Sequence, residues 1–293
     1  MNLSGPLRAE SAIRSSWAAP DVPMITILCT TYNHEAYIED AILSFLAQDV
    51  AVPFEIIIRD DCSTDATQAI IRKYHALYPN IIQPIIEEKN TFRLGVSPWV
   101  VSFPMARGQY LAICEGDDYW TDPNKLQRQY EIMEANPAWS FCCHNAEILY
   151  VESGRFTSFN QHRESGTCST KALLLDDWFV PTASIFFRKE ALPPVLPAWF
   201  SQVRSQDLAL EVILSKRGPF WYDSANASVY RKNAIGSMSA TQSTPWDYFY
   251  KRIFLFRKLF SWLPYSMSHL VVFDIARSAL KIVYAKALRY RRQ

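Results

Sequence analysis

The sequence predicts an α/β protein built on a doubly wound, mostly parallel sheet with a C-terminal helical appendage. Short apolar runs alternate with segments of helical periodicity through the first half of the 293-residue chain. The predicted strands are apolar at nearly every position, which is typical of strands buried on both faces of a parallel sheet. Polar and acidic residues follow three of these strands, at the edge of the sheet where such proteins bind ligands.

The first half of the chain is predicted to repeat a strand-helix unit. A β-rich run follows Pro23, and a helix before Pro79 is preceded by possible N-cap residues at Ser63 and Thr64. Strands are expected at 24–30, 54–58, 81–86 and 109–114, and helices at 35–48 and 66–78. No regular element is predicted between the third and fourth strands.

The second half of the chain has a less regular pattern. Asp122 and Pro123 resemble an N-cap followed by proline at the first helical position, so a helix should run from there to about Asn136. Beyond it, strands are expected at 139–150 and 182–187, a polar loop at 151–169, and helices at 170–178 and 206–217. No internal repeat is evident.

Composition indicates a reducing compartment. The six cysteines form no CxxC pair, the first twenty residues lack an apolar stretch long enough for a signal-peptide core, and no uncharged apolar run reaches about eighteen residues. These features predict a cytoplasmic protein that is soluble or lies peripherally on the cytoplasmic face of a membrane without crossing it.

Two acidic clusters end neighbouring predicted strands, Asp60-Asp61 after the second and Asp117-Asp118 after the fourth. Adjacent carboxylates repel, so such a pair usually holds a cation, caps a helix or stays solvated. Simple turn chemistry explains many short acidic motifs, but two clusters at one edge of a sheet predict a shared crevice. Four acids there would repel a nucleotide diphosphate unless Mn²⁺ or Mg²⁺ lay between them, so a divalent metal is expected.

Five motifs, in this order, resemble the GT-A fold glycosyltransferases of family 2. They are Thr30-Thr31-Tyr32-Asn33, Asp60-Asp61-Cys62-Ser63-Thr64-Asp65, Arg107-Gly108-Gln109-Tyr110, Glu115-Gly116-Asp117-Asp118-Tyr119-Trp120 and Gln206-Asp207. The resemblance covers about residues 24–236. It implies an inverting glycosyltransferase that moves a sugar from a nucleotide diphosphate donor, most often UDP-linked, to a hydroxyl of a saccharide or lipid-linked acceptor in cell-surface polysaccharide synthesis.

The resemblance assigns the donor site position by position. It implies that Thr30 and Tyr32 border the nucleotide base and that Asp61 hydrogen-bonds it. Asp117 would contact the ribose or the metal, and Asp118 would be the more direct metal ligand.

The resemblance also assigns the reacting side of the site. Asp207 is implied to be the general base that takes the proton of the acceptor hydroxyl, although from the sequence alone it would be a helix N-cap beside Ser205. Arg93 could reach the diphosphate or remain a solvated loop residue. Trp120 and Glu115 could contact the acceptor or the donor sugar, although a tryptophan at this place could equally pack in the core.

Several positions depart from the family pattern. Glu115 stands in place of an aspartate, Gln206 in place of a glutamate, and Asn233 where many members have a histidine that can ligate the metal. These departures leave open a catalytically inactive nucleotide-sugar binding or scaffold protein. A nucleotidyltransferase is a further alternative, but residues 31–35 lack the glycine-rich, basic phosphate loop that such enzymes carry.

Four other polar residues receive weaker interpretations. Arg231 and Lys232 could neutralise phosphate or be ordinary surface charges, and His34 and His144 are interpreted as structural because no other ligand type stands at metal spacing from them.

The final segment is electrostatically distinct. Residues 246–293 hold ten Lys and Arg and two Asp, a net charge of +8, whereas the whole chain carries +1. Aromatic and basic residues interleave there in two predicted helical stretches, which suits an anionic membrane surface, with packing on the catalytic domain or on a second subunit as an equal alternative. No nucleic-acid partner is predicted.

The predicted organisation follows from these boundaries. It comprises an N-terminal tail at 1–22, a catalytic domain at 23–245 and a basic, aromatic helical segment at 246–293. Within the catalytic domain, the nucleotide-binding half spans about 23–120 and the acceptor half about 121–245.

Overall fold

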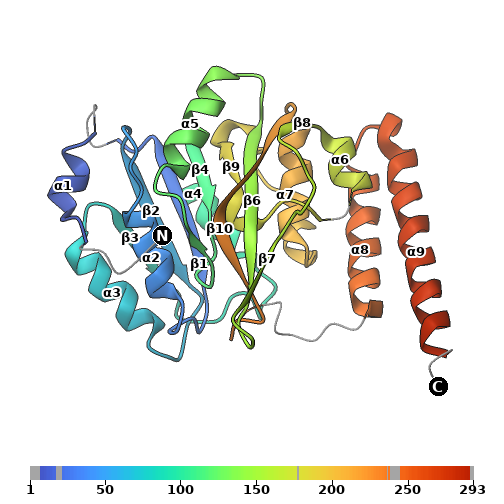
Figure 1. Cartoon of the computed structure of the whole chain (residues 1–293), viewed down its shortest axis with the longest axis horizontal. Coiled ribbons are helices and arrows are strands. Elements are labelled where there is room, and N and C mark those ends of the chain that lie inside the picture. Colours follow the sequence, from blue (N-terminus) through green and yellow to red (C-terminus); the bar gives the residue numbers. More distant parts are fainter. Residues whose placement is uncertain (1–6, 18–21, 177, 236, 238–244, 291–293) are drawn as a thin grey trace.

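The protein, analysed as a computed structural model, is an α/β structure in which helices cover both faces of one sheet (Figure 1). The structure describes residues 7–17, 22–176, 178–235, 237 and 245–290. The strands lie in the order β3-β2-β1-β4-β9-β6-β10-β5, with β7 beside β6 and β8 beside β10. The strands β1 to β4 pair in parallel, as do β6 and β10, whereas β9 runs antiparallel to β4 and β6. The predicted fold class is confirmed.

The first half of the chain follows the predicted alternation closely. Its elements are α1 (Glu10–Arg14), β1 (Ile25–Thr31), α2 (Ile38–Leu46), β2 (Phe54–Asp60), α3 (Thr67–Leu77), β3 (Ile82–Ile86), α4 (Pro98–Met105) and β4 (Tyr110–Ile113). Helix α4 was not predicted. Pro98 occupies the first turn, where a missing N–H is tolerated, and Ser97 caps the helix by accepting a hydrogen bond from Trp99 N at 3.3 Å.

The second half differs more from the prediction. Its elements are β5 (Tyr119–Trp120), α5 (Lys125–Ala135), β6 (Phe141–Tyr150), β7 (Arg155–Ser158), β8 (Gly166–Cys168), α6 (Thr170–Leu175), β9 (Phe186–Arg188), α7 (Gln206–Ser215) and β10 (Phe220–Lys232), with short 3₁₀ turns at Thr182–Ser184, Lys189–Ala191, Phe200–Gln202 and Tyr265–Met267.

Three predictions in this half were wrong, and one long strand was not predicted. Residues 151–169 contain two short strands, and 182–184 form a 3₁₀ turn ahead of β9. Helix α5 begins at Lys125 because the Asp122 side chain accepts from Asn124 N and so makes a turn there. Strand β10 was missed because its register shifts twice around the polar, partly exposed residues 223–226.

Successive side chains of the strands point to opposite faces of the sheet and pack in two apolar cores, one on each face. Ile27, Cys29 and their neighbours pack with helices α2, α3 and α5 on one face of the sheet. Leu28, Ile113 and the opposite set pack with α4, α6 and α7 on the other face. The carboxyl ends of β1, β2 and β4 therefore lie at one edge between two rigid layers.

The C-terminal helices α8 (Pro245–Phe260) and α9 (Ser268–Tyr290) form a pair at one end of the molecule (Figure 1). Leu255, Phe256 and Leu259 of α8 are buried in the second core. The guanidinium of Arg252 donates two hydrogen bonds, of 2.8 and 2.9 Å, to the buried carboxylate of Asp274 on α9. The sequence left open whether these helices pack on the catalytic domain. The face of α8 that carries Leu255, Phe256 and Leu259 does so, which confirms that alternative for this face.

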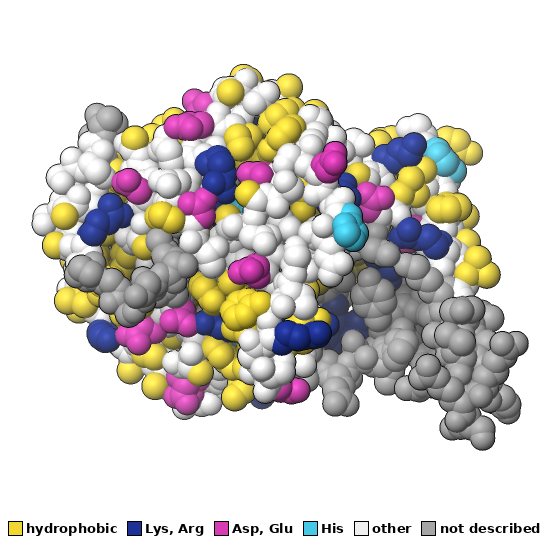
Figure 2. All heavy atoms as spheres, in the orientation of Figure 1, with side chains coloured by type: hydrophobic (Ala, Val, Ile, Leu, Met, Phe, Trp, Pro, Cys, Tyr) yellow, Lys and Arg dark blue, Asp and Glu magenta, His cyan; other side chains and the backbone are white. Residues whose placement is uncertain are grey.

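The opposite side of the helix pair is open to solvent. On the face drawn in Figure 2, hydrophobic and basic side chains lie side by side over the described part of these helices. No helix among the described residues combines the length and apolarity needed to span a bilayer. The side chains of 245–250 and 281–290 and the basic residues Arg291 and Arg292, which contribute to the membrane prediction, lie outside what the structure describes.

Candidate active site

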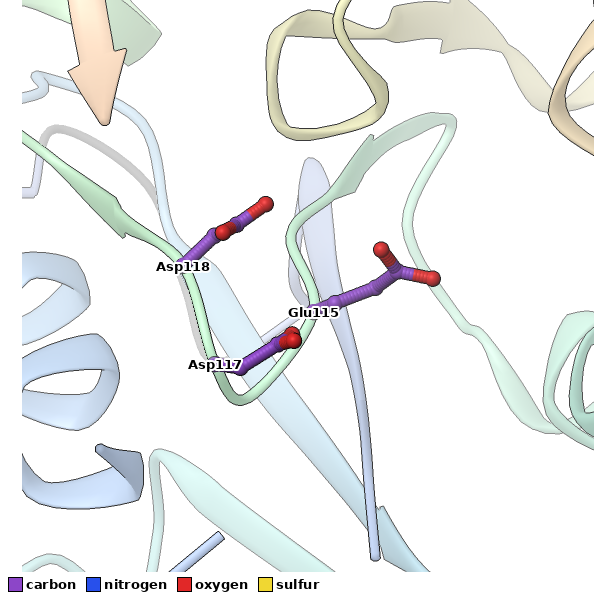
Figure 3. A group of neighbouring side chains, drawn as sticks. All are labelled: Glu115, Asp117 and Asp118. Carbon is purple, nitrogen blue, oxygen red and sulfur yellow. The ribbon is translucent and has the colours of Figure 1, made fainter. Parts of the chain in front are cut away.

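A group of three carboxylates stands at the end of β4. One oxygen from each of Glu115, Asp117 and Asp118 lies within 4.8 Å of the others, and the three side chains extend to the same side of one loop (Figure 3). Gly116 lets this loop press against the end of β1, because its N–H donates to Thr30 O at 2.9 Å and an added Cβ would lie 2.8 Å from Thr31 Oγ1. The end of β1 therefore fixes the position of the acids.

Arg231 of β10 holds the same loop from the other side. Its backbone N–H donates to Asp118 Oδ1 at 2.8 Å, and its guanidinium donates to Asp117 O at 3.0 Å and pairs with Asp40. The residue is 7% exposed, and its guanidinium lies over the Tyr119 ring. Arg231 is thus not a surface charge, because its buried guanidinium positions the loop; its contact with a phosphate stays a prediction.

The acidic group is electrostatically strained. Burial, followed by the charges of Asp117 and Asp207, raises the pKa of Glu115 to about 8. Burial, then Asp117 and Glu115, also raises the pKa of Asp118 well above its usual range. Carboxylate oxygens this close together are the ligands that Mg²⁺ and Mn²⁺ prefer, and a cation would relieve their repulsion. The residues fit the expected metal, and Glu115 belongs to this group; its contact with the acceptor or the donor sugar stays a prediction.

Asp207 is the second residue of α7 and lies near enough to Glu115 to raise the pKa of that carboxyl. Burial raises the pKa of Asp207 itself. Ser205 makes no side-chain cap hydrogen bond at this helix. Instead, Ser97 Oγ donates to Gln206 Oε1 at 2.7 Å, so the glutamine that departs from the family pattern ties the start of α7 to α4.

The first acidic cluster does not belong to the close group of three, because its carboxylates are held by hydrogen bonds at the end of β2, and the crevice shared by the two clusters stays a prediction. Asp60 accepts hydrogen bonds from Ser63 N at 2.9 Å and from Gln68 Nε2 at 2.8 Å. Asp61 accepts from Thr91 N at 2.9 Å and from Phe92 N at 3.0 Å. Both carboxylates organise turns at the end of β2, and the base contact of Asp61 stays a prediction.

The other predicted nucleotide contacts lie at the same edge of the sheet. Thr30 and Tyr32 are partly exposed at the end of β1, and Asn33 turns the chain with a left-handed φ of 53°. Asn33 Oδ1 accepts from Thr64 N at 2.8 Å, which joins the ends of β1 and β2. Arg93 is exposed in the loop before α4. Their contacts with a nucleotide remain predictions.

Trp120 is a core residue, so its predicted contact with a sugar is wrong and the packing alternative is correct. The side chain is completely buried, its indole N–H donates to Ala183 O at 2.8 Å, and Phe45 meets the ring edge at a centroid distance of 4.8 Å. The buried ammonium of Lys125 lies 3.6 Å from the ring centroid. The ring has no surface left for a ligand.

Two further residues of this region were not identified from the sequence. His34, interpreted there as structural, is buried with Nε2 4.0 Å from Asp117 Oδ2. Glu211, one turn after Asp207 on α7, is buried, and burial followed by Asp207 raises its pKa well above the usual range. In the sequence, the one feature that could have pointed to Glu211 is a carboxyl on an otherwise apolar helix face. No feature of the sequence pointed to His34, because no other ligand type stands at metal spacing from it.

Comparisons with known proteins agree with this architecture. The sequence matches the model of Glycosyl transferase family 2 over residues 26–214. An uncharacterised protein of Mycobacterium tuberculosis is 36% identical over 213 residues, covering 72% of this chain and 60% of that protein. The match with a Bacillus subtilis protein named for teichuronic acid biosynthesis, the glycosyltransferase TuaG, is 34% identical over 120 residues, covering 41% of this chain and 46% of that protein. The chain thus spans about 60% of the length of the mycobacterial relative.

Two solved structures share the fold. Staphylococcus aureus TarS, residues 1–349 in complex with UDP-GlcNAc, superposes with a TM-score of 0.63 at 17% identity, covering 88% of this chain and 72% of that one. The mannosyltransferase PcManGT from Pyrobaculum calidifontis, in complex with GDP-Man and Mn²⁺, superposes with a TM-score of 0.59 at 16% identity, covering 97% and 79%. The likeness shows a GT-A fold, and with the family match it establishes that the chain belongs to glycosyl transferase family 2.

Proposed function

We propose that this chain is an inverting, metal-dependent glycosyltransferase. It would move a sugar from a nucleotide diphosphate sugar, UDP-linked, to a hydroxyl of a saccharide or lipid-linked acceptor in cell-surface polysaccharide synthesis. The observation that carries the proposal is the close group of Glu115, Asp117 and Asp118 at the end of β4, with Asp207 of α7 near enough to raise the pKa of Glu115. The named relatives and the nucleotide-sugar complexes of the two solved structures support it.

The acidic group defines the donor side of the proposed site. Asp118 and Asp117 would hold Mn²⁺ or Mg²⁺, with Glu115 beside them, and the bound ion supplies Lewis-acid neutralisation of the leaving diphosphate. Thr30, Tyr32 and Asp61 stand at the ends of β1 and β2, where the nucleotide base would lie. Arg231 keeps the loop of the acids in place while the donor binds.

Asp207 is the proposed general base. Burial raises its pKa, so its carboxylate is a better proton acceptor near neutral pH than a solvated aspartate. The acceptor oxygen would form a bond to the anomeric carbon as its proton passes to Asp207 and the bond from that carbon to the diphosphate oxygen breaks. Attack from the face opposite the leaving group inverts the configuration at this carbon.

The proposal also places the enzyme at an anionic membrane surface through α8 and α9. Helix α9 exposes Val272, Phe273 and Leu280 on one side, and Phe254 of α8 is exposed beside the cations of that helix. Apolar side chains flanked by Lys and Arg suit the boundary between headgroups and acyl chains. A membrane location would bring a lipid-linked acceptor to Asp207.

The test is a binding and turnover assay with a panel of nucleotide sugars. We expect one donor to raise the melting temperature only when Mn²⁺ or Mg²⁺ is present, since a ligand of the native state stabilises it by mass action. Slow release of the sugar should follow and should disappear in Asp118→Ala. Tight donor binding without turnover under any acceptor would favour the inactive scaffold, and pyrophosphate release from a nucleoside triphosphate would favour a nucleotidyltransferase.

A further inference from the structure

A basic pocket with a volume of about 480 Å³ lies between the loop that precedes α7 and the helix α8. This volume is within the range of about 300 to 1,000 Å³ that small-molecule sites occupy. Three cations, one amide and two apolar side chains line the basic pocket: Arg204, Lys251, Arg257, Gln202, Ile253 and Phe254. No acid stands among these lining residues, so the basic pocket is suited to an anion.

The three cations have no carboxylate partner within the described part of the chain. Elsewhere on the same helix pair, Arg252 and Arg277 both contact the buried carboxylate of Asp274. Like charges that line one pocket repel each other, and a phosphate relieves this repulsion because it accepts charge-assisted hydrogen bonds from guanidinium and ammonium groups. Three positive charges favour a ligand with more than one negative charge.

Both walls of the basic pocket are held by the second apolar core. Phe200 and Val203 are buried in that core on the side of the loop, and Leu255 and Phe256 are buried in it on the side of α8. Helix α8 lies between α7 and α9 in the view of Figure 1. The backbone on each side of the basic pocket is thus fixed before a ligand binds, which reduces the entropy lost on binding.

The basic pocket also lies close to the proposed general base. Arg204 stands three residues before Asp207, and three residues of chain span at most about 11 Å. The proposed function places the acceptor hydroxyl at the carboxylate of Asp207. An acceptor held in the basic pocket by a phosphate group would therefore present the sugar nearest to that phosphate to the base.

The apolar side of the basic pocket fits a hydrocarbon chain. Ile253 and Phe254 line it, and Phe254 is 38% exposed. Ile253, Arg257 and Phe260 recur at i, i+4 and i+7, so they share one side of α8, and Phe260 is 46% exposed there. Apolar side chains thus continue along the helix beyond the cations. Inorganic phosphate or a free nucleotide would leave these side chains without a partner, whereas a phosphate that carries a lipid would cover them.

We propose that the basic pocket binds the phosphate or diphosphate of a lipid-linked acceptor. Arg204, Lys251 and Arg257 contact the phosphate oxygens, and the lipid chain lies along Ile253 and Phe254. This inference rests on the proposed function and deepens it, because it names the class of acceptor: a sugar joined to a lipid through phosphate.

The first measurement is the affinity of dodecyl phosphate, kept below its critical micelle concentration, by titration calorimetry. Dodecyl maltoside has the same chain without the charge, and inorganic phosphate has the charge without the chain. We expect dodecyl phosphate to bind at one site per protein chain, about tenfold or more tightly than either comparison compound, since only dodecyl phosphate makes both sets of contacts. Equal affinity for dodecyl phosphate and dodecyl maltoside would overturn the proposal.

Removal of charge identifies the basic pocket as the binding site. Arg204→Gln combined with Arg257→Gln should weaken dodecyl phosphate binding about 100-fold, or about tenfold for each lost cation. Both residues are exposed, so the melting temperature should not change. The matched control, Arg72→Gln combined with Lys171→Gln, removes two charges from exposed positions of α3 and α6 and should keep the wild-type affinity. An equal affinity in the two double variants would overturn the site.

The apolar contact has its own variant. Phe254→Gln should weaken the binding of dodecyl phosphate several-fold and leave the affinity for inorganic phosphate unchanged, because only the alkyl chain contacts this ring. A Phe254→Gln protein that binds dodecyl phosphate as tightly as wild type would show that the chain lies elsewhere, and the lipid part of the proposal would fail.

Two further measurements separate an acceptor site from a site for bulk membrane lipid. Dihexanoyl phosphatidylglycerol is a soluble membrane lipid with one negative charge, and it should bind several-fold more weakly than dodecyl phosphate at pH 8, above the second pKa of a phosphate monoester, about 6. With Mn²⁺ bound at the acidic group, the phosphorus NMR signal of bound dodecyl phosphate should relax faster, and this effect should disappear in Asp118→Ala. Equal binding of the two lipids, or binding without this relaxation, would overturn the acceptor assignment.

The outcomes distinguish this inference from the proposed function. If a nucleotide sugar binds and turns over while dodecyl phosphate shows no preference for the basic pocket, the acceptor class is overturned and the transferase proposal stands. If no nucleotide sugar binds with Mn²⁺ or Mg²⁺ although dodecyl phosphate binds and depends on Arg204 and Arg257, the transferase proposal fails and the lipid-phosphate site stands.

Discussion

The backbone N–H of Arg231 and the carboxylate of Asp118 are joined by a 2.8 Å hydrogen bond across 113 residues of sequence. Through it, β10 in the second half of the chain fixes an acid that follows β4 in the first half. The same arginine places its guanidinium on Asp117 O and on Asp40. The geometry of the acidic loop therefore depends on the whole sheet having formed.

Replacing Arg231 should loosen the acidic loop without abolishing the fold. We expect Arg231→Met to weaken Mn²⁺-dependent UDP binding about tenfold or more, because the guanidinium no longer links the loop, through Asp117 O, to Asp40 of α2. Arg231→Lys should recover little, since an ammonium cannot make both contacts. Titration calorimetry measures the affinity, and Lys171→Met, at an exposed position of α6, is the control. Equal UDP affinity in Arg231→Met and wild type would contradict the positioning role.

Substitution of the proposed base should affect a different measured quantity from substitution of the proposed metal ligand. Asp207→Asn should lower the transfer rate by about 10² to 10⁴-fold and leave UDP affinity nearly unchanged, because a general base acts in the chemical step. Asp118→Asn should instead weaken Mn²⁺ binding, which electron paramagnetic resonance can measure. A rate in Asp207→Asn within a few-fold of wild type would remove this residue from the mechanism.

A methyl group at Gly116 should disrupt the acidic loop. An added Cβ would lie 2.8 Å from Thr31 Cβ and 3.0 Å from Ile38 Cδ1, so Gly116→Ala has to push the loop away from β1. We expect a lower melting temperature and weaker Mn²⁺ binding. Gly166→Ala is the matched control, because an added Cβ there meets no atom within 4 Å. Normal Mn²⁺ affinity in Gly116→Ala would show that the close contact with β1 is unimportant.

The buried Lys125 should make stability depend on pH in the alkaline range. Burial lowers the pKa of this lysine from 10.5 to about 7, so between these values the unfolded chain binds more protons than the folded chain and stability rises with pH. Lys125→Met should therefore be more stable than wild type at pH 7.5. The shift in pKa corresponds to a gain of about 2 to 4 kcal/mol, and losing the contact between the ammonium and the Trp120 ring reduces this gain. Urea unfolding at pH 7.5 and 9.5 tests this, and the difference between the two proteins should narrow at the higher pH. A methionine variant less stable at both values would show that the ammonium is stabilising.

Charge on the exposed face of α9 should abolish membrane binding. Val272 and Phe273 are 56% and 57% exposed, so Val272→Glu with Phe273→Glu should fold normally and sediment less with vesicles that contain phosphatidylglycerol. Val195→Glu is the control, since Val195 is 81% exposed on the sheet domain. Neutral phosphatidylcholine vesicles should bind all variants weakly. Unchanged sedimentation of the double variant would contradict contact through α9.

The parts of the fold that could be predicted are those encoded by local pattern. Ile25–Thr31 and Phe54–Asp60 are buried almost throughout, and their apolar runs indicated parallel strands directly. Strand β10 could not be identified from the sequence. Its pairing with β6 contains a polar bulge, and this bulge interrupts the alternation of apolar and polar residues by which a strand is predicted. The fold class was therefore correct while several elements of the second half were not.

The site shows the same division between local and distant information. Asp117 and Asp118 were identified because their motif is contiguous, and the structure brings them together with Glu115. Asp61 stands in an equally contiguous motif, but apart from Arg59, two positions before it, its partners are residues 91–92, thirty positions away. The burial of Trp120 depends likewise on Ala183, 63 residues on. Partners this far apart leave no periodic signal in the sequence.

The burial of Leu255, Phe256 and Leu259 bears on how the protein can be shortened. A fragment ending at residue 245 would uncover the apolar patch on which α8 rests, and large exposed apolar patches promote aggregation. Any loss of vesicle binding by such a fragment would then be confounded by misfolding. Point substitutions on the solvent side of α9 are accordingly the cleaner way to separate catalysis from attachment.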